Sequence, residues 1–274
     1  MLRPILLVLT LAATTNAESL KLITWNIESG GADPAVIAEQ LTELPRVDAY
    51  LLQEVSAKDI GRFAAAIRKA HGKSYKYYLG SLGGGDRLAI VVDENQWKIR
   101  SFAELFSFED YRLNDWRHRS PLVAALQRQN DGQECLLVNV HLASGNAELR
   151  TEQAEGLREW AKVQTAPVIL AGDCNFDFNF LTKRGNKGHA AFFAGAVFRE
   201  AVPEQLIDTN WSDRNDDGQD DYPDSCLDFG AFCENGCKVN GSCKVIVRDG
   251  DSPDTKATSD HRPLLVTFQL GDSE

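Results

Sequence analysis

The sequence of 274 residues predicts an α/β fold with mixed β-sheets. From Leu20 onward, short apolar runs rich in β-branched and aromatic residues alternate with amphipathic stretches, as strands and helices do. Residues 134–173 run strand, long helix, strand, which requires parallel strands joined by a crossover. Closely spaced runs at 87–93, 97–105 and 121–128 indicate antiparallel neighbours. A composition of 43% hydrophobic and 25% charged residues suits a globular domain.

The expected elements follow one another without an internal repeat or a linker. We therefore expect one domain over residues 18–274, with an acidic, cysteine-rich insert at about 210–245. The first helix would have Asp33 as its N-cap and Pro34 in its first turn. The stretch 233–243 is expected to be a loop between two strands. Strands are expected at 20–27, 49–55, 87–93, 97–105, 121–128, 134–142, 167–173, 226–232, 244–250 and 263–270, and helices at 32–44, 58–70, 146–164 and 188–198.

Residues 1–17, MLRPILLVLTLAATTNA, have the layout of a secretory signal peptide. One Arg precedes an apolar run from Ile5 to Leu11, and small residues lead to Ala17. The alternative, a membrane anchor or a buried strand, is disfavoured because the run is far shorter than the ~20 residues that span a bilayer. We expect an exported chain, secreted or periplasmic, that is monomeric and has no stable membrane association.

The net charge disfavours tight non-specific binding of nucleic acid. The formal charge of -11 becomes -12 when the signal peptide is removed with Arg3. Phosphate binding depends on Lys and Arg, so this sign weakens a nucleic-acid partner. A good part of the excess lies in one acidic stretch, where a bound cation would reduce it, so the partner is not excluded.

Six cysteines in an exported chain indicate disulfides rather than metal thiolates. Four of them lie between residues 226 and 243 with no His among them, which argues against zinc. Six cysteines permit 15 pairings, and the pattern does not choose among them. Cys135 and Cys174 lie at opposite ends of neighbouring strands and should not pair, whereas Cys226 is a candidate partner for Cys174. The six are Cys135, Cys174, Cys226, Cys233, Cys237 and Cys243.

The stretch SDRNDDGQDDYPDSCLD, residues 212–228, has the spacing of a calcium-binding loop. Tyr222 and Pro223 oppose an exit helix, so the pattern is closer to an isolated extracellular loop than to a helix-loop-helix sensor. The alternative is a solvated acidic loop. We expect a structural Ca²⁺ at the rim of the active site. Its ligands would be Asp213, Asn215, Asp217, the backbone of Gln219, Asp221 and Asp224, with Gly218 at the sharp turn.

Polar side chains recur where the expected strands end. They are Asn26, Glu54, His141, Asp173 and Asn175. In α/β sheets ligands bind at this edge. Each residue has a structural alternative: a turn for the two asparagines, a solvated strand end for Glu54, a core imidazole for His141 and a loop cap for Asp173. Together they predict an active site.

Seven motifs carry a resemblance to the endonuclease/exonuclease/phosphatase superfamily. They are TWNI, LLQEV, RSPLVAAL, VNVHLASG, VILAGDCNFD, LDFGAF and SDHRPL, in the family's order. The resemblance covers roughly residues 20–270. It implies a deoxyribonuclease I-like sandwich of four layers, α/β/β/α, in which helices flank two mixed sheets. It also implies metal-dependent phosphoesterase chemistry.

The resemblance implies roles for the motif residues. Glu54 resembles the principal Mg²⁺ (or Mn²⁺) ligand, with Asn26 and Asp260 nearby. Oxygen ligands suit such a cation, which offsets charge on the phosphoryl group. The implied water-activating or phosphate-facing acid is Asp173, the implied phosphoryl-binding amide is Asn175, and the implied imidazole beside the phosphate is His261. Asp228 matches an acid that orients an active-site histidine, and we favour His141 as its partner. Arg119 matches a residue that contacts phosphate, and Arg87 is a weaker candidate for that role.

We therefore expect an exported Mg²⁺-dependent phosphodiesterase, an endonuclease that hydrolyses DNA. Ala143 departs from the HLKSG pattern of many such nucleases, and Cys174 stands where the family usually has an aromatic residue. The alternatives are a sphingomyelinase or phosphoinositide phosphatase, and a silent calcium-binding adhesion protein. The first would need a membrane-facing loop, which we do not identify in the sequence. The second would lack catalytic positions, and none is missing.

Overall fold

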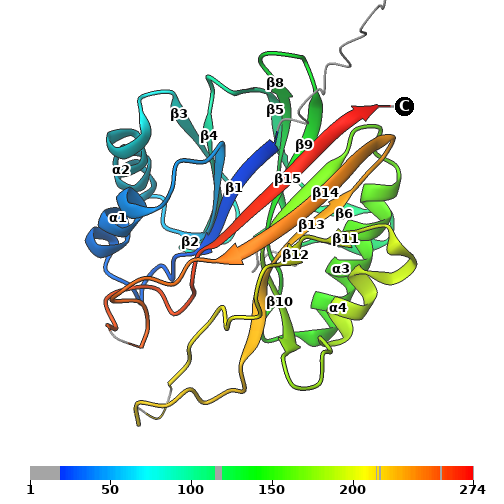
Figure 1. Ribbon diagram of the computed structural model, residues 1–274. Coiled ribbons are helices and arrows are strands. Elements are labelled where there is room, and N and C mark those ends of the chain that lie inside the picture. The colour runs from blue at the N-terminus through cyan, green and yellow to red at the C-terminus, as the bar shows by residue number, and fades with distance from the viewer. Residues whose placement is uncertain (1–18, 115–118, 214, 216, 254, 274) are drawn as a thin grey trace, which may run out of the picture.

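Two β-sheets lie face to face, with helices on both outer faces (Figure 1). The computed structural model describes residues 19–114, 119–213, 215, 217–253 and 255–273. The expected signal peptide, residues 1–17, lies outside them. Two mixed sheets between helical layers confirm the predicted four-layer sandwich. Within the described residues, no helix combines the length and the apolar character needed to cross a membrane.

Among the described residues, seven strands form the first sheet and six the second. The order in the first sheet is β12 (Val202–Pro203), β14 (Cys237–Val245), β15 (Leu264–Ser273), β1 (Ser19–Asn26), β2 (Ala49–Val55), β4 (Arg87–Asp93) and β3 (Tyr75–Leu79). The order in the second is β11 (Arg199–Glu200), β13 (Ser225–Cys233), β10 (Val168–Asn179), β9 (Glu134–His141), β8 (Leu122–Arg128) and β5 (Trp97–Glu104). A small hairpin pairs β6 (Ser107–Phe108) with β7 (Tyr111–Arg112).

The helices lie in two pairs, one for each sheet (Figure 1). The first pair packs on the first sheet through a core that includes Trp25, Tyr50 and Phe63, and the second pair packs on the second sheet. A third core fills the space between the sheets, so three apolar layers hold the four layers together. The helices are α1 (Pro34–Glu43), α2 (Ile60–His71), α3 (Ala147–Lys162) and α4 (Lys187–Phe192), followed by a 3₁₀ turn at Ala194–Ala196.

Several sequence predictions are confirmed. Asp33 caps α1, because its Oδ1 accepts from the N–H of Ala35 at 2.8 Å, and Pro34 begins the helix. The β9–α3–β10 unit has parallel strands in which Asp173 pairs with His141. Strands β5 and β8 are antiparallel neighbours, but β4 belongs to the other sheet.

The cysteine-rich stretch was predicted wrongly as a loop. Only residues 234–236 form a turn, and the rest from Cys237 onward belongs to β14. Most residues of β14 alternate between buried and exposed, and Cys237, Val239 and Cys243 pack in the core between the sheets. A glycine suits position 241, because the Cβ of any other residue would lie only 3.0 Å from the Phe268 ring. The expected strand at 244–250 was wrong, since β14 ends at Val245. The expected helix at 188–198 is shorter, and β3, β11 and β12 were not predicted.

All six cysteines are free thiols, so the structure gives no support to the predicted disulfides. Cys135, Cys237 and Cys243 pack as apolar side chains between the sheets, and Cys174 is buried under α3 and α4. Along the β10–β13 pair, Cys226 lies opposite Phe178 rather than opposite Cys174.

Candidate active site

A cleft of about 720 Å³ opens where β1, β2, β9 and β10 end. Parallel pairing places β1 beside β2 and β9 beside β10, so their carboxyl ends meet at one edge of the sandwich. The five strand-end residues predicted as a site all line this cleft. Asp260 and His261, from the loop before β15, line it as well. The structure thus brings together residues that lie more than two hundred positions apart.

Asn26 links the two halves of the site. Its Nδ2 donates to Glu54 Oε1 at 3.2 Å and to Asp173 Oδ2 at 3.0 Å, so one amide spans from β2 in the first sheet to β10 in the second. Its Oδ1 accepts from the N–H of Glu28 at 3.1 Å. Glu54 adopts a φ of 54°, at the end of its strand, which re-aims the side chain into the cleft.

Glu28 is a site residue that the sequence reasoning missed. Its Oε2 accepts from the N–H of Asp260 at 3.0 Å, and it lines the cleft with Glu54. The only signal was an acid two residues after Asn26, beyond the expected end of the strand. Burial and the neighbouring charge of Asp260 raise the pKa of Glu28 to about 7. Burial likewise raises the pKa of Glu54 and that of Asp260.

These acids and Asn26 form a set of hard oxygen donors that fits a divalent cation. The carboxylates of Glu28, Glu54 and Asp260 lie close together and resist ionisation. A bound cation would offset their negative charge and stabilise the ionised forms. Within the described residues, no group of three or more His, Cys, Asp or Glu side chains already has the arrangement of a formed metal site. The fit therefore rests on the chemistry of the donors and on their raised pKa values.

Asp228 pairs with His261, and the prediction that it orients His141 was wrong. His261 Nδ1 lies 2.8 Å from Asp228 Oδ2, with both residues buried. The register of β10 with β13 sets Asp228 opposite Asp173, and the loop before β15 brings His261 over both. Although burial opposes the charged ring, Asp228 and Asp173 raise the pKa of His261 well above its usual value.

Asp173 lies between two imidazoles. Its Oδ2 is 3.3 Å from His141 Nε2 and 3.7 Å from His261 Nε2. Burial, with a further contribution from Asp228, raises the pKa of Asp173 to about 7, and the charge of His261 opposes this rise. Asn175 follows with a φ of 50°, and its Nδ2 donates to the carbonyl of Leu142 at 3.1 Å.

Arg119 contacts both Glu54 and His141. Its Nη2 lies 2.7 Å from His141 Nε2 and 3.7 Å from Glu54 Oε1. Burial lowers the pKa of the Arg119 guanidinium from an ordinary value that is far above neutrality. Arg87 instead donates to the carbonyl of Gly84 at 3.1 Å, so it braces a turn.

The described residues of the acidic loop, 212, 213, 215 and 217–224, curl around Asp213. The two carboxylate oxygens of Asp213 accept from the N–H groups of Asp217 and Gly218 at 3.0 and 2.9 Å. Asn215 donates to Asp221 Oδ1 at 3.1 Å, and Gln219 donates its N–H to Asp217 Oδ1 at 2.9 Å. Gly218 has a φ of 80°, as expected for the turn. The remaining predicted ligand, Asp224, lies where the chain rejoins β13, and its carbonyl accepts from the N–H of Phe180.

The chain that leads into the acidic loop is hydrogen-bonded to the sequence neighbours of Asp228 and His261, a pair that we call the dyad. Thr209 Oγ1 accepts from the N–H of Leu227 at 2.9 Å, and Thr209 O accepts from the N–H of Arg262 at 2.8 Å. Trp211 donates its N–H to the carbonyl of Asp260 at 2.7 Å. Tyr222, from the same loop, lines the cleft. The acidic loop therefore forms one wall of the site.

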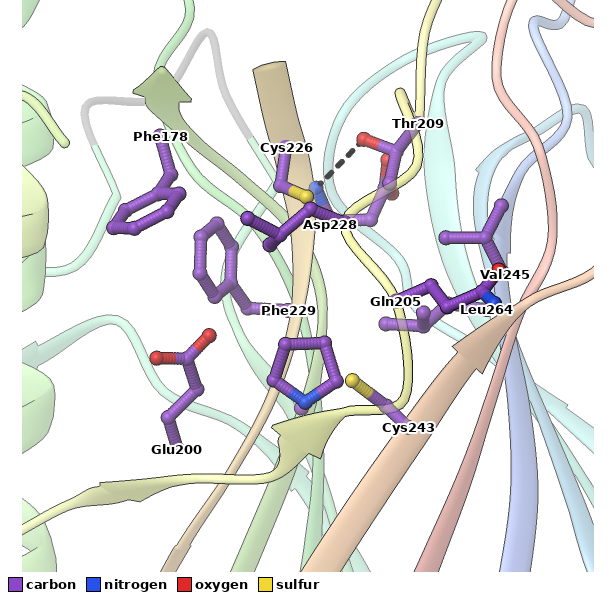
Figure 2. A pocket seen from close by; sticks show the side chains of 13 residues that line it. Phe178, Glu200, Gln205, Thr209, Cys226, Asp228, Phe229, Cys243, Val245 and Leu264 are labelled. Atoms are coloured by element: carbon purple, nitrogen blue, oxygen red, sulfur yellow. Dashed lines mark hydrogen bonds between the residues drawn. The ribbon is translucent and has the colours of Figure 1, made fainter. Parts of the chain in front are cut away.

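A second, smaller pocket lies behind the dyad, between the two sheets (Figure 2). Its volume is about 20 Å³, and its wall includes Asp228, Phe229 and Leu264. Figure 2 also shows the thiols of Cys226 and Cys243 beside it. This mainly apolar backing keeps bulk solvent away from Asp228, so its attraction to His261 is weakly screened.

Comparison with known families agrees with this geometry. The model of the Endonuclease/Exonuclease/phosphatase family matches residues 23–261, so the chain belongs to that family. It is a phosphoesterase of this superfamily. A comparison with curated proteins finds no match.

Solved structures share the fold at low identity. An endonuclease/exonuclease/phosphatase family protein from Bacteroides thetaiotaomicron is 19% identical, with a TM-score of 0.69 over 93% of this chain and 98% of that one. D. rerio TDP2 complexed with single strand DNA product is 20% identical, with a TM-score of 0.69 over 91% and 98%. A mannosyl-6-phosphatase from B. thetaiotaomicron is 17% identical, with a TM-score of 0.64 over 92% and 100%. At these identities the likeness establishes the fold alone.

Proposed function

We propose that this protein is an exported phosphodiesterase that uses Mg²⁺, or Mn²⁺ in its place, and hydrolyses DNA as an endonuclease. One observation carries the proposal: the Asp173 carboxylate lies between two imidazoles, and Asn26 joins it to Glu54. Hydrolysis of a diester needs a base for water, an acid for the leaving oxygen and a cation for the phosphoryl charge. This constellation supports all three.

Asn26, Glu54 and Asp260 would hold the ion, and Glu28 is a further oxygen donor beside them. A bound divalent cation supplies charge that offsets the negative charge developing on the phosphoryl oxygens and on the leaving group. Arg119, just before β8, adds a positive charge beside Glu54. Arg119, His141 and Asn175 would together contact the phosphoryl oxygens.

Proton transfer falls to Asp173 and His261. Asp173 can accept the proton of the attacking water, because a pKa of about 7 matches a base that works near neutrality. The Asp228 carboxylate keeps His261 charged and oriented through Nδ1, so Nε2 is free to donate to the leaving oxygen. This assignment gives Asp228 a positioning role only.

DNA is favoured as substrate because a relative of the same fold, D. rerio TDP2, was crystallised with a single strand DNA product. The mannosyl-6-phosphatase shows that the fold also serves sugar phosphates, so the assay must separate the two. Export is proposed from residues 1–17. A structural Ca²⁺ in the acidic loop is proposed from its spacing, and it would hold the wall of the cleft in place.

Hydrolysis of plasmid DNA, RNA, sphingomyelin, mannose 6-phosphate and bis-p-nitrophenyl phosphate, each with Mg²⁺ or with EDTA, tests the proposal. We expect Mg²⁺-dependent nicking of DNA that is lost in His261→Ala and kept in His71→Ala, a histidine outside the cleft. Turnover of mannose 6-phosphate without cleavage of either DNA or the small diester would refute a phosphodiesterase. Nicking that survives EDTA would refute the role of the metal.

A further inference from the structure

The turn after β10 and the first residue of α4 expose three cations near the cleft. We name residues 180–187, FLTKRGNK, the basic finger. In the sequence it reads only as a polar loop. Its side chains Lys183, Arg184 and Lys187 are exposed, and no ion pair joins any of them to another described residue. Leu181, near its tip, is 91% exposed. These cations are thus free to contact something outside the chain.

The basic finger is firmly built. Asn179 Oδ1 accepts from the N–H groups of Leu181 and Thr182 at 3.1 and 2.9 Å, and the N–H of Asn179 donates to the carbonyl of Arg184 at 3.0 Å. Asn186 Nδ2 donates to the carbonyl of Asn175 at 2.7 Å and to Asp177 Oδ2 at 2.8 Å. The backbone of the turn is therefore anchored on β10, the strand that carries Asn175, and this fixes where its exposed side chains begin.

The finger lies next to the acidic loop but has the opposite charge. The N–H of Phe180 donates to the carbonyl of Asp224, so the two segments are directly joined. Figure 1 shows the end of β10 and the acidic loop at the same edge of the molecule. Tyr222 and Pro223 of the acidic loop and Asp177 and Asn179 at the root of the finger line the cleft. An acidic segment and a basic segment thus lie side by side near the mouth of the cleft, in a chain of net charge -11.

We propose that the basic finger binds the phosphate backbone of a DNA strand as it leaves the cleft, so that the strand runs over Lys183, Arg184 and Lys187 and away from the acidic loop. This rests on the proposed function and specifies an extended polyanion as its substrate. The three cations do not line the cleft, so a sugar phosphate or a small diester held at Asp173 does not reach them. A DNA strand has a phosphate at each nucleotide, so it would extend from the cleft to these cations.

A membrane surface fits the finger less well. Leu181 is the single large apolar side chain that the finger exposes fully. Stable attachment to a bilayer takes a broad apolar face or two separate anchoring signals. The one exposed leucine of the basic finger supplies too little apolar area for this. The three cations instead match neighbouring phosphates on one strand.

Binding of a fluorescent single-stranded oligonucleotide at several salt concentrations, with Mg²⁺ present, tests the inference. Asp173→Asn serves as the uncleaving background. In it we compare K183Q/R184Q/K187Q with the matched triple R62Q/K69Q/K73Q, which removes the same charge from exposed sites in and just after α2, on the other sheet. We expect the finger triple to raise Kd about tenfold or more and to reduce the slope of log K against log salt by about 2. The α2 triple should change neither.

Turnover of bis-p-nitrophenyl phosphate, with Asp173 intact, separates the finger from the catalytic centre. We expect its kcat/KM to stay unchanged in the finger triple. The inference is overturned if the wild-type chain does not bind the oligonucleotide, if both triples weaken binding equally, or if the small diester is affected as strongly as DNA. Finger-dependent binding to anionic vesicles but not to DNA would also overturn it. If DNA binds through the finger but is never cleaved, the finger stands and the proposed nuclease function fails.

Discussion

The carboxylate of Asp228, on β13, holds the ring of His261, with Nδ1 2.8 Å from Oδ2. Asp228 and Asp173 are direct partners in the pairing of β10 with β13, so a single strand register places one acid at each nitrogen of the imidazole. Although burial opposes it, the two carboxylates raise the pKa of His261 and so favour its charged form. The Trp25 indole fixes the loop, because it donates to the His261 carbonyl at 2.8 Å.

Replacement of Asp228 with Asn should cost kcat a factor of about 10²–10⁴, the range of a lost general acid. The pKa of His261 should also fall, because the nearest anion that raises it is gone. The alkaline limb of the pH–rate profile would then move to lower pH while KM changes little. Asp110→Asn, at an exposed site on the β6–β7 hairpin, is the matched control. An unchanged profile would contradict the positioning role.

Mg²⁺ should stabilise the protein more at high pH than at low pH. The folded pKa of Glu28 is about 7, against an ordinary value of 4.5, so the metal-free fold retains a proton that the unfolded chain releases. Its contribution to stability is therefore present at low pH and is lost as the pH rises through 7. A cation beside the ionised carboxylate reverses this loss. The Mg²⁺-induced rise in Tm should be larger near about pH 8 than near about pH 5.5.

Glu28→Gln tests the origin of that difference. Without an ionisable group at this position, the pH dependence of the Tm shift should become smaller. Glu39→Gln, on the surface of α1, should leave it as in the wild type. A Tm shift that is equal at both pH values in the wild-type chain would show that the buried acids are not linked to Mg²⁺.

The strand ends were predictable, whereas the partner of Asp228 was not. Asn26, Glu54 and Asp173 each follow an apolar run, and parallel strands bring such ends to one edge. The choice between His141 and His261 depends on the β10–β13 register and on the course of the loop before β15. Neither is encoded in local periodicity, so the sequence favoured the wrong imidazole.

The failure at β14 has a chemical origin. Cys237, Val239, Cys243 and Val245 alternate with exposed residues, which is the period of a strand with one buried face. Cysteines assumed to form bridges were not counted as apolar residues, although free Cys behaves as a small hydrophobe. Glu28 escaped notice because it lies beyond the strand end, where only the packing of the Asp260 loop brings it to the site.

Gly172→Ala should destabilise the fold strongly. A Cβ at this position would lie 2.0 Å from the Val140 carbonyl oxygen, and the backbone φ of 155° is unfavourable for a side chain. Since β9 and β10 are hydrogen-bonded neighbours here, relief requires the strands to separate, at a cost of about 3 kcal/mol or more. Urea unfolding measures it. Gly61→Ala, in α2 with open space around it, should instead stabilise by about 0.5–1 kcal/mol. Equal effects would refute the close approach.

Ca²⁺ should raise Tm through the acidic loop, with a dissociation constant of about 10⁻⁴–10⁻³ M, as in extracellular modules. Asp217→Asn changes an expected ligand, whereas Asp220→Asn removes the same charge at a neighbouring position that is not one. The first should weaken Ca²⁺ binding at least about tenfold, and the second should change it little. Because Trp211 joins this loop to the Asp260 carbonyl, Ca²⁺ should also lower KM for DNA. Calorimetry that detects equal Ca²⁺ binding in both variants would show that only the net charge of the loop attracts the ion.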